Sequence, residues 1–311
     1  MKNSILLSTR SNKSLAEKVA EKLDIKLCNV KIKDFADAEI SVEVLENIRR
    51  QEVFIIAGTS THSNKNVDIM EIMLLVDAVK RSSPERITVI FPYLPYARQD
   101  RRIQRSPISS SVFAHMLSHS GIDSVIACDL HTLQIQGFFS NNVVCEHIST
   151  LNTMRKHVEN NNYDCIVASD IGGTGRARYF ANLLDLPIAI IDKRRPEPGV
   201  SKVMHIIGDV KGKKCCIVDD IVDGGGTLVN AAEALIAEKA KLVDGVIVHG
   251  VFSKGAINRI SSSQINRLYI SNSIEQIRDL PDKIEVVDID DLLAETIRRF
   301  CNGESLKALV S

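Results

Sequence analysis

The sequence predicts an α/β protein with two domains. Short apolar, strand-like runs alternate with helical patterns through the second half of the chain, which is typical of a parallel sheet covered by helices on both faces. The 311 residues are also enough for two domains of ordinary size, each with its own core. The sequence becomes polar and irregular after Ser140, so we place the boundary near residue 145.

The composition limits the possible partners. Lys plus Arg equals Asp plus Glu at 39 each, so no overall field would attract nucleic acid or an anionic membrane. The seven cysteines form no C-x-x-C pair and lie mostly in apolar runs, which favours reduced core thiols and a cytoplasmic protein. No run approaches the roughly 20 apolar residues that cross a bilayer, so we expect a soluble protein.

Strand and helix signals also fill the first half. Residues 14–23 carry Leu15, Val19 and Leu23 at helical spacing, and the strand that starts at residue 86 is stopped by Pro92. The other elements expected here are strands at 5–8, 53–57 and 124–131 and helices at 68–80 and 112–120.

Two loops of the first half carry candidate ligand groups. Phe35, Asp37 and Glu39 lie at a turn between alternating strands, where an aromatic face beside two acceptors could hold a purine; acidic hairpin turns are also common without any ligand. Four arginines lie within eight residues between prolines, and such a loop could close over a polyphosphate or be an ordinary charged surface loop. These arginines are Arg98, Arg101, Arg102 and Arg105.

Asp129 and His131 end the strand expected at residues 124–131. Residues two apart on a strand point to the same side, and His is a common metal ligand. A hydrogen-bonded histidine with no metal is the alternative at this stage.

The second half contains the alternating series. A glycine-rich turn at 172–175 follows the strand that ends in Asp170. We expect strands at 164–170, 187–192, 203–209, 215–218, 242–252 and 268–272, and helices at 151–159, 176–184, 228–239, near 256 and at 291–300. Ligands of such sheets bind where strands end, so Asp170, Lys193 and the segment after residue 218 should lie at one edge.

Residues 213–231 combine a buried strand, two acids, three glycines and a helix start. Gly224, Gly225 and Gly226 can take positive φ and let backbone N–H groups approach a phosphate, while Thr227 can donate its hydroxyl at the helix N-terminus. Asp219 and Asp220 are placed for hydroxyl groups or Mg²⁺. A sugar phosphate fits this pattern, although an ordinary glycine turn is the simpler alternative. Neither G-x-G-x-x-G nor the P-loop pattern occurs.

Four motifs in order, YARQDR, CDLHTLQIQGFF, AIIDKRRP and VDDIVDGGGT, closely resemble the signatures of the ribose-phosphate pyrophosphokinase family. The resemblance implies two tandem phosphoribosyltransferase-like domains, each a mainly parallel twisted sheet with helices on both faces, at 1–145 and 146–311, with a tail that could pack back on the first. It also implies transfer of the diphosphoryl group of MgATP to the anomeric hydroxyl of ribose 5-phosphate, in a homo-oligomer such as a hexamer that shares active sites between subunits.

Matching the motifs residue by residue assigns the expected roles. Lys193 and Arg195 are implied to be catalytic, and His131 and Asp170 to bind Mg²⁺. ATP is implied to contact Phe35, Asp37, Ala38, Glu39, Arg98, Gln99 and Asp100. Ribose 5-phosphate is implied to contact Arg195, Asp219, Asp220, Asp223, Gly224, Gly225, Gly226 and Thr227.

The chain departs from the family pattern at several positions. Ala38 replaces a glycine, which costs roughly 1 kcal/mol if the turn needs positive φ. Ile171 replaces a histidine after the metal-binding Asp170, and the loop from Arg101 to Pro107 is one residue shorter than usual. Asn47 and Lys307 stand where phosphate-responsive members often have Ser, although Arg49 and Ser305 match, so we expect weak or altered control by phosphate and ADP.

Two other functions are compatible with parts of this pattern. A phosphoribosyltransferase would share the VDDIVDGGGT loop but would not need the acidic turn, the arginine loop or DKRRP. A non-catalytic subunit that regulates a true synthetase would tolerate Ala38 and the shorter loop, but the intact His131, Asp170, Lys193 and Arg195 argue against it.

Overall fold

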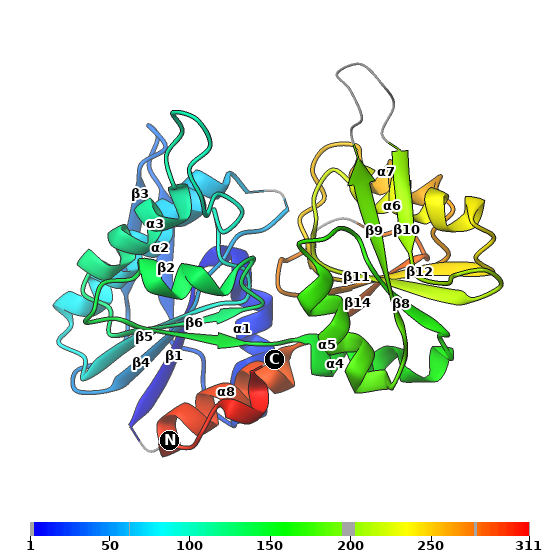
Figure 1. Cartoon of the computed structure of the whole chain (residues 1–311). Helices are drawn as coiled ribbons and strands as arrows, with labels where there is room; N and C mark the ends of the chain where they lie inside the picture. Colours follow the sequence, from blue (N-terminus) through cyan, green and yellow to red (C-terminus); the bar gives the residue numbers. More distant parts are fainter. Residues whose placement is uncertain (1–2, 62, 195–202, 277–278, 311) are drawn as a thin grey trace. The chain divides into compact units, whose positions relative to one another are not determined.

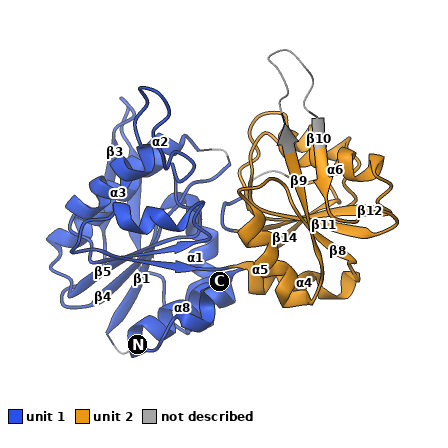
Figure 2. Ribbon diagram, in the orientation of Figure 1, with its two compact units in different colours: residues 1–149, 273–277, 289–310 blue, residues 150–272, 278–288, 311 orange. Residues whose placement is uncertain are grey.

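The computed structural model describes residues 3–61, 63–194, 203–276 and 279–310, which form two compact units (Figure 2). Unit 1 comprises residues 1–149, 273–277 and 289–310, and unit 2 comprises residues 150–272, 278–288 and 311. The chain therefore leaves unit 1 after Ser149 and returns to it twice. Residue 145 lies inside a strand of unit 1, four residues before this division.

Unit 1 is built on a five-stranded sheet in which every neighbouring pair is parallel. The strand order is β1-β4-β5-β6-β7. The strands are β1 (Ser4–Ser8), β4 (Glu52–Ile56), β5 (Arg86–Phe91), β6 (Ser124–Cys128) and β7 (Val144–Ile148). The central strands are apolar throughout because both faces of the sheet are covered.

Helices cover both faces of this sheet (Figure 1). Leu15, Val19 and Leu23 of α1 are buried, as their spacing predicts, in a core that they share with α8. The other face carries α2 and α3, whose apolar residues form a second core. The helices are α1 (Lys13–Leu23), α2 (Lys65–Arg81), α3 (Ser109–His119) and α8 (Asp290–Asn302), with short 3-10 turns η1 (Arg10–Asn12), η2 (Leu133–Phe138) and η4 (Lys307–Leu309).

A separate antiparallel hairpin lies beside the sheet of unit 1. It pairs β2 (Val30–Asp34) with β3 (Ile40–Val44), and β3 lies along α2. Val30, Val42 and Val44 pack against the core beneath α2. The loop of this hairpin holds the predicted acidic turn.

Unit 2 contains a seven-stranded sheet in the order β10-β9-β8-β11-β12-β13-β14. All neighbours are parallel except β10, which is antiparallel to β9. The strands are β8 (Cys165–Ala168), β9 (Ile188–Arg194), β10 (Val203–Ile207), β11 (Lys214–Val222), β12 (Leu242–Gly250), β13 (Leu268–Ser271) and β14 (Ile284–Val287).

The sheet of unit 2 is also covered on both faces. Residues of α4 (Leu151–Val158) and α5 (Thr174–Leu184) belong to one core, and residues of α6 (Gly226–Ala237) and α7 (Ala256–Ser261) belong to the other. The 3-10 turn η3 (Glu159–Asn161) follows α4. The predicted α/β architecture with mainly parallel sheets and helices on both faces is confirmed.

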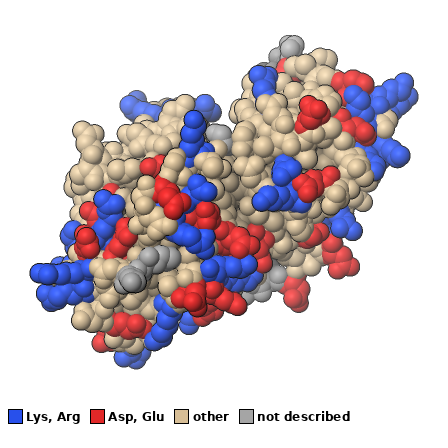
Figure 3. All heavy atoms as spheres, turned by 90° about the horizontal axis from the view of Figure 1, so that it is seen from below, with Lys and Arg blue, Asp and Glu red and all other residues tan. Residues whose placement is uncertain are grey.

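The surface and the cysteines agree with the composition. Figure 3 shows Lys and Arg interspersed with Asp and Glu on the face that it draws. All seven cysteines are free thiols, and five of them are buried. Among the described helices, none is both long enough and apolar enough to span a bilayer.

Candidate active site

The centre of the unit 2 sheet is a point where the strand order reverses. β8 and β11 are hydrogen-bonded neighbours, but the chain continues from β8 to β9 on one side and from β11 to β12 on the other. The connecting loops diverge at such a point and leave a crevice at the carboxyl ends of the strands, where α/β proteins bind ligands. Ser169 and Asp170 follow β8 here, and Asp219 and Asp220 lie in the last part of β11.

The turn after β8 brings its acid close to the acids of β11. Asp170 Oδ1 accepts a hydrogen bond of 3.0 Å from the backbone N–H of Gly173, the residue that precedes α5. A methyl group on Gly173 would lie 3.7 Å from Asp170 Oδ1 and 3.8 Å from Asp219 Oδ1. A side chain at position 173 would therefore reach into the space beside both carboxylates, which glycine leaves open.

Asp219 is held by hydrogen bonds in a partly buried position. The hydroxyl of Ser169 donates to Oδ2, and the backbone N–H of Asp220 donates to Oδ1 at 2.9 Å. Burial raises the pKa of Asp219 to about 7, and the neighbouring charge of Asp220 adds to this effect, whereas Ser169 and Arg176 oppose it. The carboxyl group can therefore exchange a proton near neutral pH.

Arg176 of α5 forms ion pairs with both acids of β11, Asp219 and Asp220. Its Nη1 lies 3.2 Å from Asp220 Oδ1 and 3.6 Å from Asp219 Oδ1. The side chain of Asp220 is 6% exposed and that of Asp219 is 19% exposed, so Asp219 is the more open acceptor. Arg176 was not identified from the sequence, because its role depends on α5 lying against β11.

The predicted phosphate loop leads directly into α6. Gly225 has φ +73° and is the residue before the helix, and a methyl group there would lie 3.2 Å from Ile260 Cγ1. Gly225, the N-cap residue, has no side chain that could cap this helix, and the first turn carries no acid. The first backbone N–H groups of an α-helix have no intrahelical acceptor, so this end can accept an anion.

Arg259 of α7 holds the loop from behind. Its Nη1 donates a hydrogen bond to the carbonyl of Gly224. Since the carbonyl of Gly224 and the N–H of Gly225 point in opposite directions across a trans peptide, this bond turns the N–H of Gly225 away from Arg259. No local signal predicted this contact, because Arg259 follows the next strand, 35 residues later.

The acidic turn of unit 1 is a hairpin loop of three residues, 36–38, between the hydrogen-bonded Phe35 and Glu39. Phe35 N–H donates to the carbonyl of Glu39 at 2.8 Å, Ala38 N–H donates to the carbonyl of Phe35 at 2.9 Å, and Ala38 has φ +70°. A left-handed third residue is typical of such loops. Residue 38 thus has the positive φ at which we expected alanine to cost roughly 1 kcal/mol relative to glycine. Phe35 as a whole residue is 58% exposed, so its ring is accessible for stacking.

The arginine loop is tied down at its start. Gln99 Oε1 accepts from the hydroxyl of Ser109 at 2.6 Å, and Asp100 Oδ2 accepts from that of Thr132 at 2.8 Å. Residues 101–107, which carry Arg101, Arg102 and Arg105, are all exposed. Arg98 is exposed just before this segment. The structure thus joins the arginine loop to α3 and to the segment that contains His131.

The expected pairing of Asp129 and His131 on one side of a strand is wrong. β6 ends at Cys128, and Asp129 has φ +40°, so the alternation of a strand does not continue through these residues. Asp129 is buried, and its Oδ1 accepts from the hydroxyl of Ser149 at 3.2 Å, whereas His131 is half-buried. Asp129 therefore supports the strand end, and only His131 remains a candidate ligand.

Comparison with known proteins decides the family. A family model for the N-terminal domain of ribose phosphate pyrophosphokinase matches residues 4–121, and one for the phosphoribosyl synthetase-associated domain matches residues 193–311. The chain is 45% identical over 310 residues to a ribose-phosphate pyrophosphokinase of Mesorhizobium japonicum, covering 98% of this chain and 99% of that protein. This chain belongs to the ribose-phosphate pyrophosphokinase family.

Other members of the family give the same result. A ribose-phosphate pyrophosphokinase of Brucella melitensis is 44% identical over 311 residues, covering 98% of this chain and 99% of that protein. The crystal structure of phosphoribosylpyrophosphate synthetase from Mycobacterium smegmatis is 33% identical and superposes with a TM-score of 0.88, covering 97% of this chain and 99% of that one. Both units thus have the phosphoribosyltransferase-like fold of a phosphoribosylpyrophosphate synthetase.

The carboxylate groups of the site suit Mg²⁺, the ion that the family resemblance implies. Among the described residues, no group of three or more His, Cys, Asp or Glu side chains could hold a metal ion by itself. Mg²⁺ is commonly bound by one or two carboxylates together with substrate phosphates, rather than by protein ligands alone. A single carboxylate such as Asp170 is compatible with this mode of binding.

The implied catalytic residues lie at the limit of the described chain. Lys193 is in β9, where its backbone pairs with Met204 of β10. β9 is parallel to β8, so its carboxyl end lies at the same edge as Asp170. The side chain of Lys193 and the whole of Arg195 lie outside the described residues.

Proposed function

We propose that this chain is a catalytic ribose-phosphate pyrophosphokinase that makes phosphoribosyl pyrophosphate and AMP from ATP and ribose 5-phosphate. The observation that carries the proposal is the arrangement around β8 and β11, where Asp170 and Asp219 lie at neighbouring strand ends and β11 leads through the glycine loop into the N-terminus of α6. Such a site can accept hydroxyl groups and a phosphate of one ligand. The family membership supplies the reaction.

Ribose 5-phosphate is the proposed acceptor and binds to unit 2. The 5-phosphate binds the N–H groups of the loop before α6, with Thr227 exposed to donate its hydroxyl. Asp219 accepts hydrogen bonds from the ribose hydroxyls, and Asp220 holds Arg176 beside it. The residues proposed for this ligand are Arg195, Asp219, Asp220, Asp223, Gly224, Gly225, Gly226 and Thr227.

ATP is the proposed donor and binds to unit 1. The exposed ring of Phe35 stacks on the adenine, and Asp37 and Glu39 flank it as acceptors. Arg98, Gln99 and Asp100 contact the nucleotide from the anchored start of the arginine loop. The exposed arginines that follow can neutralise phosphate charge.

The proposed step is an in-line displacement at phosphorus. The anomeric oxygen of ribose forms a bond to the β-phosphorus, the bond from that phosphorus to the oxygen bridging to the α-phosphate breaks, AMP leaves with the bridging oxygen, and the hydroxyl proton goes to solvent. Lys193 and Arg195 place positive charge where negative charge develops, which is the main protein contribution to such transfers. Bound Mg²⁺, for which we propose Asp170 and His131 as ligands, would neutralise phosphate charge.

The reaction can be tested directly by phosphorus NMR. Purified protein with ATP, ribose 5-phosphate and Mg²⁺ should produce AMP and a ribose that carries a diphosphate. Lys193→Ala should lose most of this activity, because removing one well-placed donor costs about 3 kcal/mol, or a factor of hundreds. ADP as the sole product would instead indicate another kind of kinase, and full activity of Lys193→Ala would exclude its proposed role.

We also propose a homo-oligomer such as a hexamer, as the family resemblance implies, and a cytoplasmic location, which the seven free thiols favour. Altered control by phosphate and ADP remains a prediction from Asn47 and Lys307. Equal activity across a phosphate titration would support it, and strong activation by phosphate would contradict it.

A further inference from the structure

The hairpin that carries the proposed adenine loop has little support of its own. Its two strands form a sheet separate from the main sheet of unit 1, and two-stranded hairpins are only marginally stable alone. All residues from 33 to 39 are exposed, so no side chain at the tip is buried in a core. Val30, Val42 and Val44 pack the body of the hairpin against the core, so polar contacts are what can further fix the exposed tip.

The far end of the hairpin is anchored separately. Glu46 Oε1 accepts from the N–H and from the side-chain amide of Asn29 at 3.0 Å each, and Lys26 Nζ lies 3.3 Å from the same oxygen. These contacts fix the ends of β2 and β3 that lie away from the loop. They cannot restrain Phe35 or Glu39.

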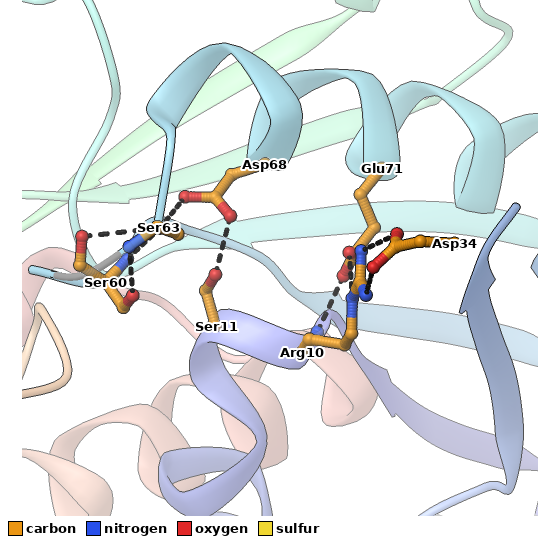
Figure 4. Close-up of polar contacts among 7 residues, drawn as sticks. All are labelled: Arg10, Ser11, Asp34, Ser60, Ser63, Asp68 and Glu71. Carbon is orange, nitrogen blue, oxygen red and sulfur yellow. Dashed lines mark hydrogen bonds and ion pairs between the residues drawn. The ribbon is translucent and has the colours of Figure 1, made fainter. Parts of the chain in front are cut away.

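Arg10 makes the contact near the tip. Its Nη1 and Nη2 donate to the two oxygens of Asp34 at 2.8 and 2.9 Å, in the paired geometry that an arginine and a carboxylate favour (Figure 4). Asp34 is the last residue of β2 and directly precedes Phe35. Arg10 therefore holds the strand at the point where the adenine loop begins.

Arg10 is itself fixed from the other side. Its Nε donates to Glu71 Oε2 at 2.6 Å, and its backbone N–H donates to Glu71 Oε1 at 2.7 Å (Figure 4). Glu71 lies on α2 and its side chain is 3% exposed. The next residue, Ser11, donates to the buried Asp68 one turn earlier on α2 at 2.8 Å. Two adjacent residues of η1 are thus locked to a helix, which makes Arg10 a rigid anchor.

We propose that Arg10 is a positioning residue for nucleotide binding, which connects the adenine hairpin through Asp34 to α2 through Glu71. The inference rests on the proposed binding of ATP at Phe35, Asp37 and Glu39. A loop that is correctly placed only part of the time binds its ligand more weakly in proportion to that fraction. Breaking the contact should therefore weaken ATP binding and leave ribose 5-phosphate binding in unit 2 unchanged.

Asp34→Ala is the appropriate variant. It removes the contact to the hairpin while Arg10 keeps its bonds to Glu71, whereas Arg10→Ala would leave the buried Glu71 carboxylate without its guanidinium. We expect the KM for ATP to rise about threefold to tenfold, with kcat and the KM for ribose 5-phosphate near the wild-type values. Asp34→Glu keeps the carboxylate and should restore most of the ATP affinity.

Glu43→Ala is the matched control. Glu43 pairs with Lys31 across the same hairpin at 3.6 Å and is similarly exposed, and none of the ion pairs of the described residues joins it to Arg10. Its loss should leave the KM for ATP unchanged. Equal KM values for ATP in Asp34→Ala and Glu43→Ala would overturn the proposal.

Hydrogen exchange of the protein without nucleotide tests the positioning separately from the reaction. The N–H groups of Phe35 and Ala38, which are bonded within the loop, should exchange faster in Asp34→Ala than in Glu43→Ala. Unchanged exchange would show that Arg10 does not order the loop. If the wild-type protein makes no AMP, the proposed function fails, but this comparison still decides whether Arg10 positions the hairpin.

Discussion

Arg176 Nη1 lies 3.2 Å from Asp220 Oδ1, so a guanidinium from α5 is paired with the more buried of two consecutive acids on β11. The same atom is 3.6 Å from Asp219, whose carboxyl is more exposed. One cation thus faces two carboxylates that repel each other. Burial first, and then the charge of Asp220, raise the pKa of Asp219 despite the opposing effect of Arg176, which leads to the first prediction.

Asp219→Asn should make stability less dependent on pH. The pKa of Asp219 is raised to about 7 by burial and by Asp220, whereas an unfolded Asp titrates near about 4. Between these values the folded chain binds more protons than the unfolded chain, so this carboxyl lowers stability as pH rises from about 4 to 7. The variant should be more stable than wild type at pH 8, by up to about 4 kcal/mol for a shift of about three pKa units, and similar near pH 4.

Thermal melts at several pH values measure this difference. Glu233→Gln, on the exposed face of α6, is the control for removing a charge from unit 2. If Asp219→Asn and wild type lose stability in parallel between pH 5 and 8, the raised pKa is wrong.

Gly225→Ala should damage both the fold and the sugar-phosphate site. The position has φ +73°, and the new methyl would lie 3.2 Å from Ile260 Cγ1, so we expect a loss of roughly 1–2 kcal/mol in the free energy of unfolding. Gly226→Ala is the control for stability, because nothing lies within 4 Å of its methyl position and Ala suits a helix. Denaturant melts of the two variants should therefore differ in sign, and equal losses would contradict the left-handed geometry at Gly225.

Arg259→Ala should raise the KM for ribose 5-phosphate by about tenfold, because a charged donor to the Gly224 carbonyl is lost and the Gly225 N–H is no longer oriented. The KM for ATP should not change. Lys254→Ala removes a nearby exposed charge of the same sign and serves as the control. Similar KM values in the two variants would indicate a general effect of charge rather than the hydrogen bond.

Ala38→Gly should stabilise the protein, because an L-residue at φ +70° is strained by about 1 kcal/mol. The greater conformational entropy of glycine in the unfolded chain offsets part of this gain. Ala36→Gly lies in the same loop, is not among the described residues with positive φ, and should be slightly destabilising. Thermal melts distinguish the two substitutions. A loss of stability in Ala38→Gly would show that the turn relaxes to accommodate Ala.

The parts of the site that follow one another along the chain could be predicted from the sequence. Gly225 and Asp219 belong to one strand-loop-helix unit, in which local residue types dictate both the turn and the exposed N–H groups. Ala38 likewise has a local requirement, since the loop length demands a left-handed residue. The alternating apolar runs also predicted most strands and helices, because each must bury one face.

Residues whose roles depend on tertiary neighbours could not be predicted in this way. Arg176 and Arg259 become parts of the site only because α5 and α7 pack against β11 and the loop that follows it. Arg10 depends on a hairpin that begins about 20 residues later, and its partner Glu71 lies on a third element. The expected pairing of Asp129 with His131 was wrong because β6 ends at Cys128, three residues earlier than expected, and the alternation of a strand stops there. β14 is only four residues long and carries a weak signal.

The pairing of α8 with α1 has a consequence for synthesis of the protein. Leu293 and Ile297 of α8 share a core with Leu15 and Val19 of α1. The ring centroids of Phe300 and Phe54 are 5.9 Å apart. The first 149 residues contain all five strands and α1 but lack α8, so the part of this core that α8 covers stays open until α8 has been made. Nascent chains usually fold from the N-terminus. Here part of the first sheet stays uncovered until α8 has been made, so chaperones have a long interval in which to bind the uncovered apolar residues.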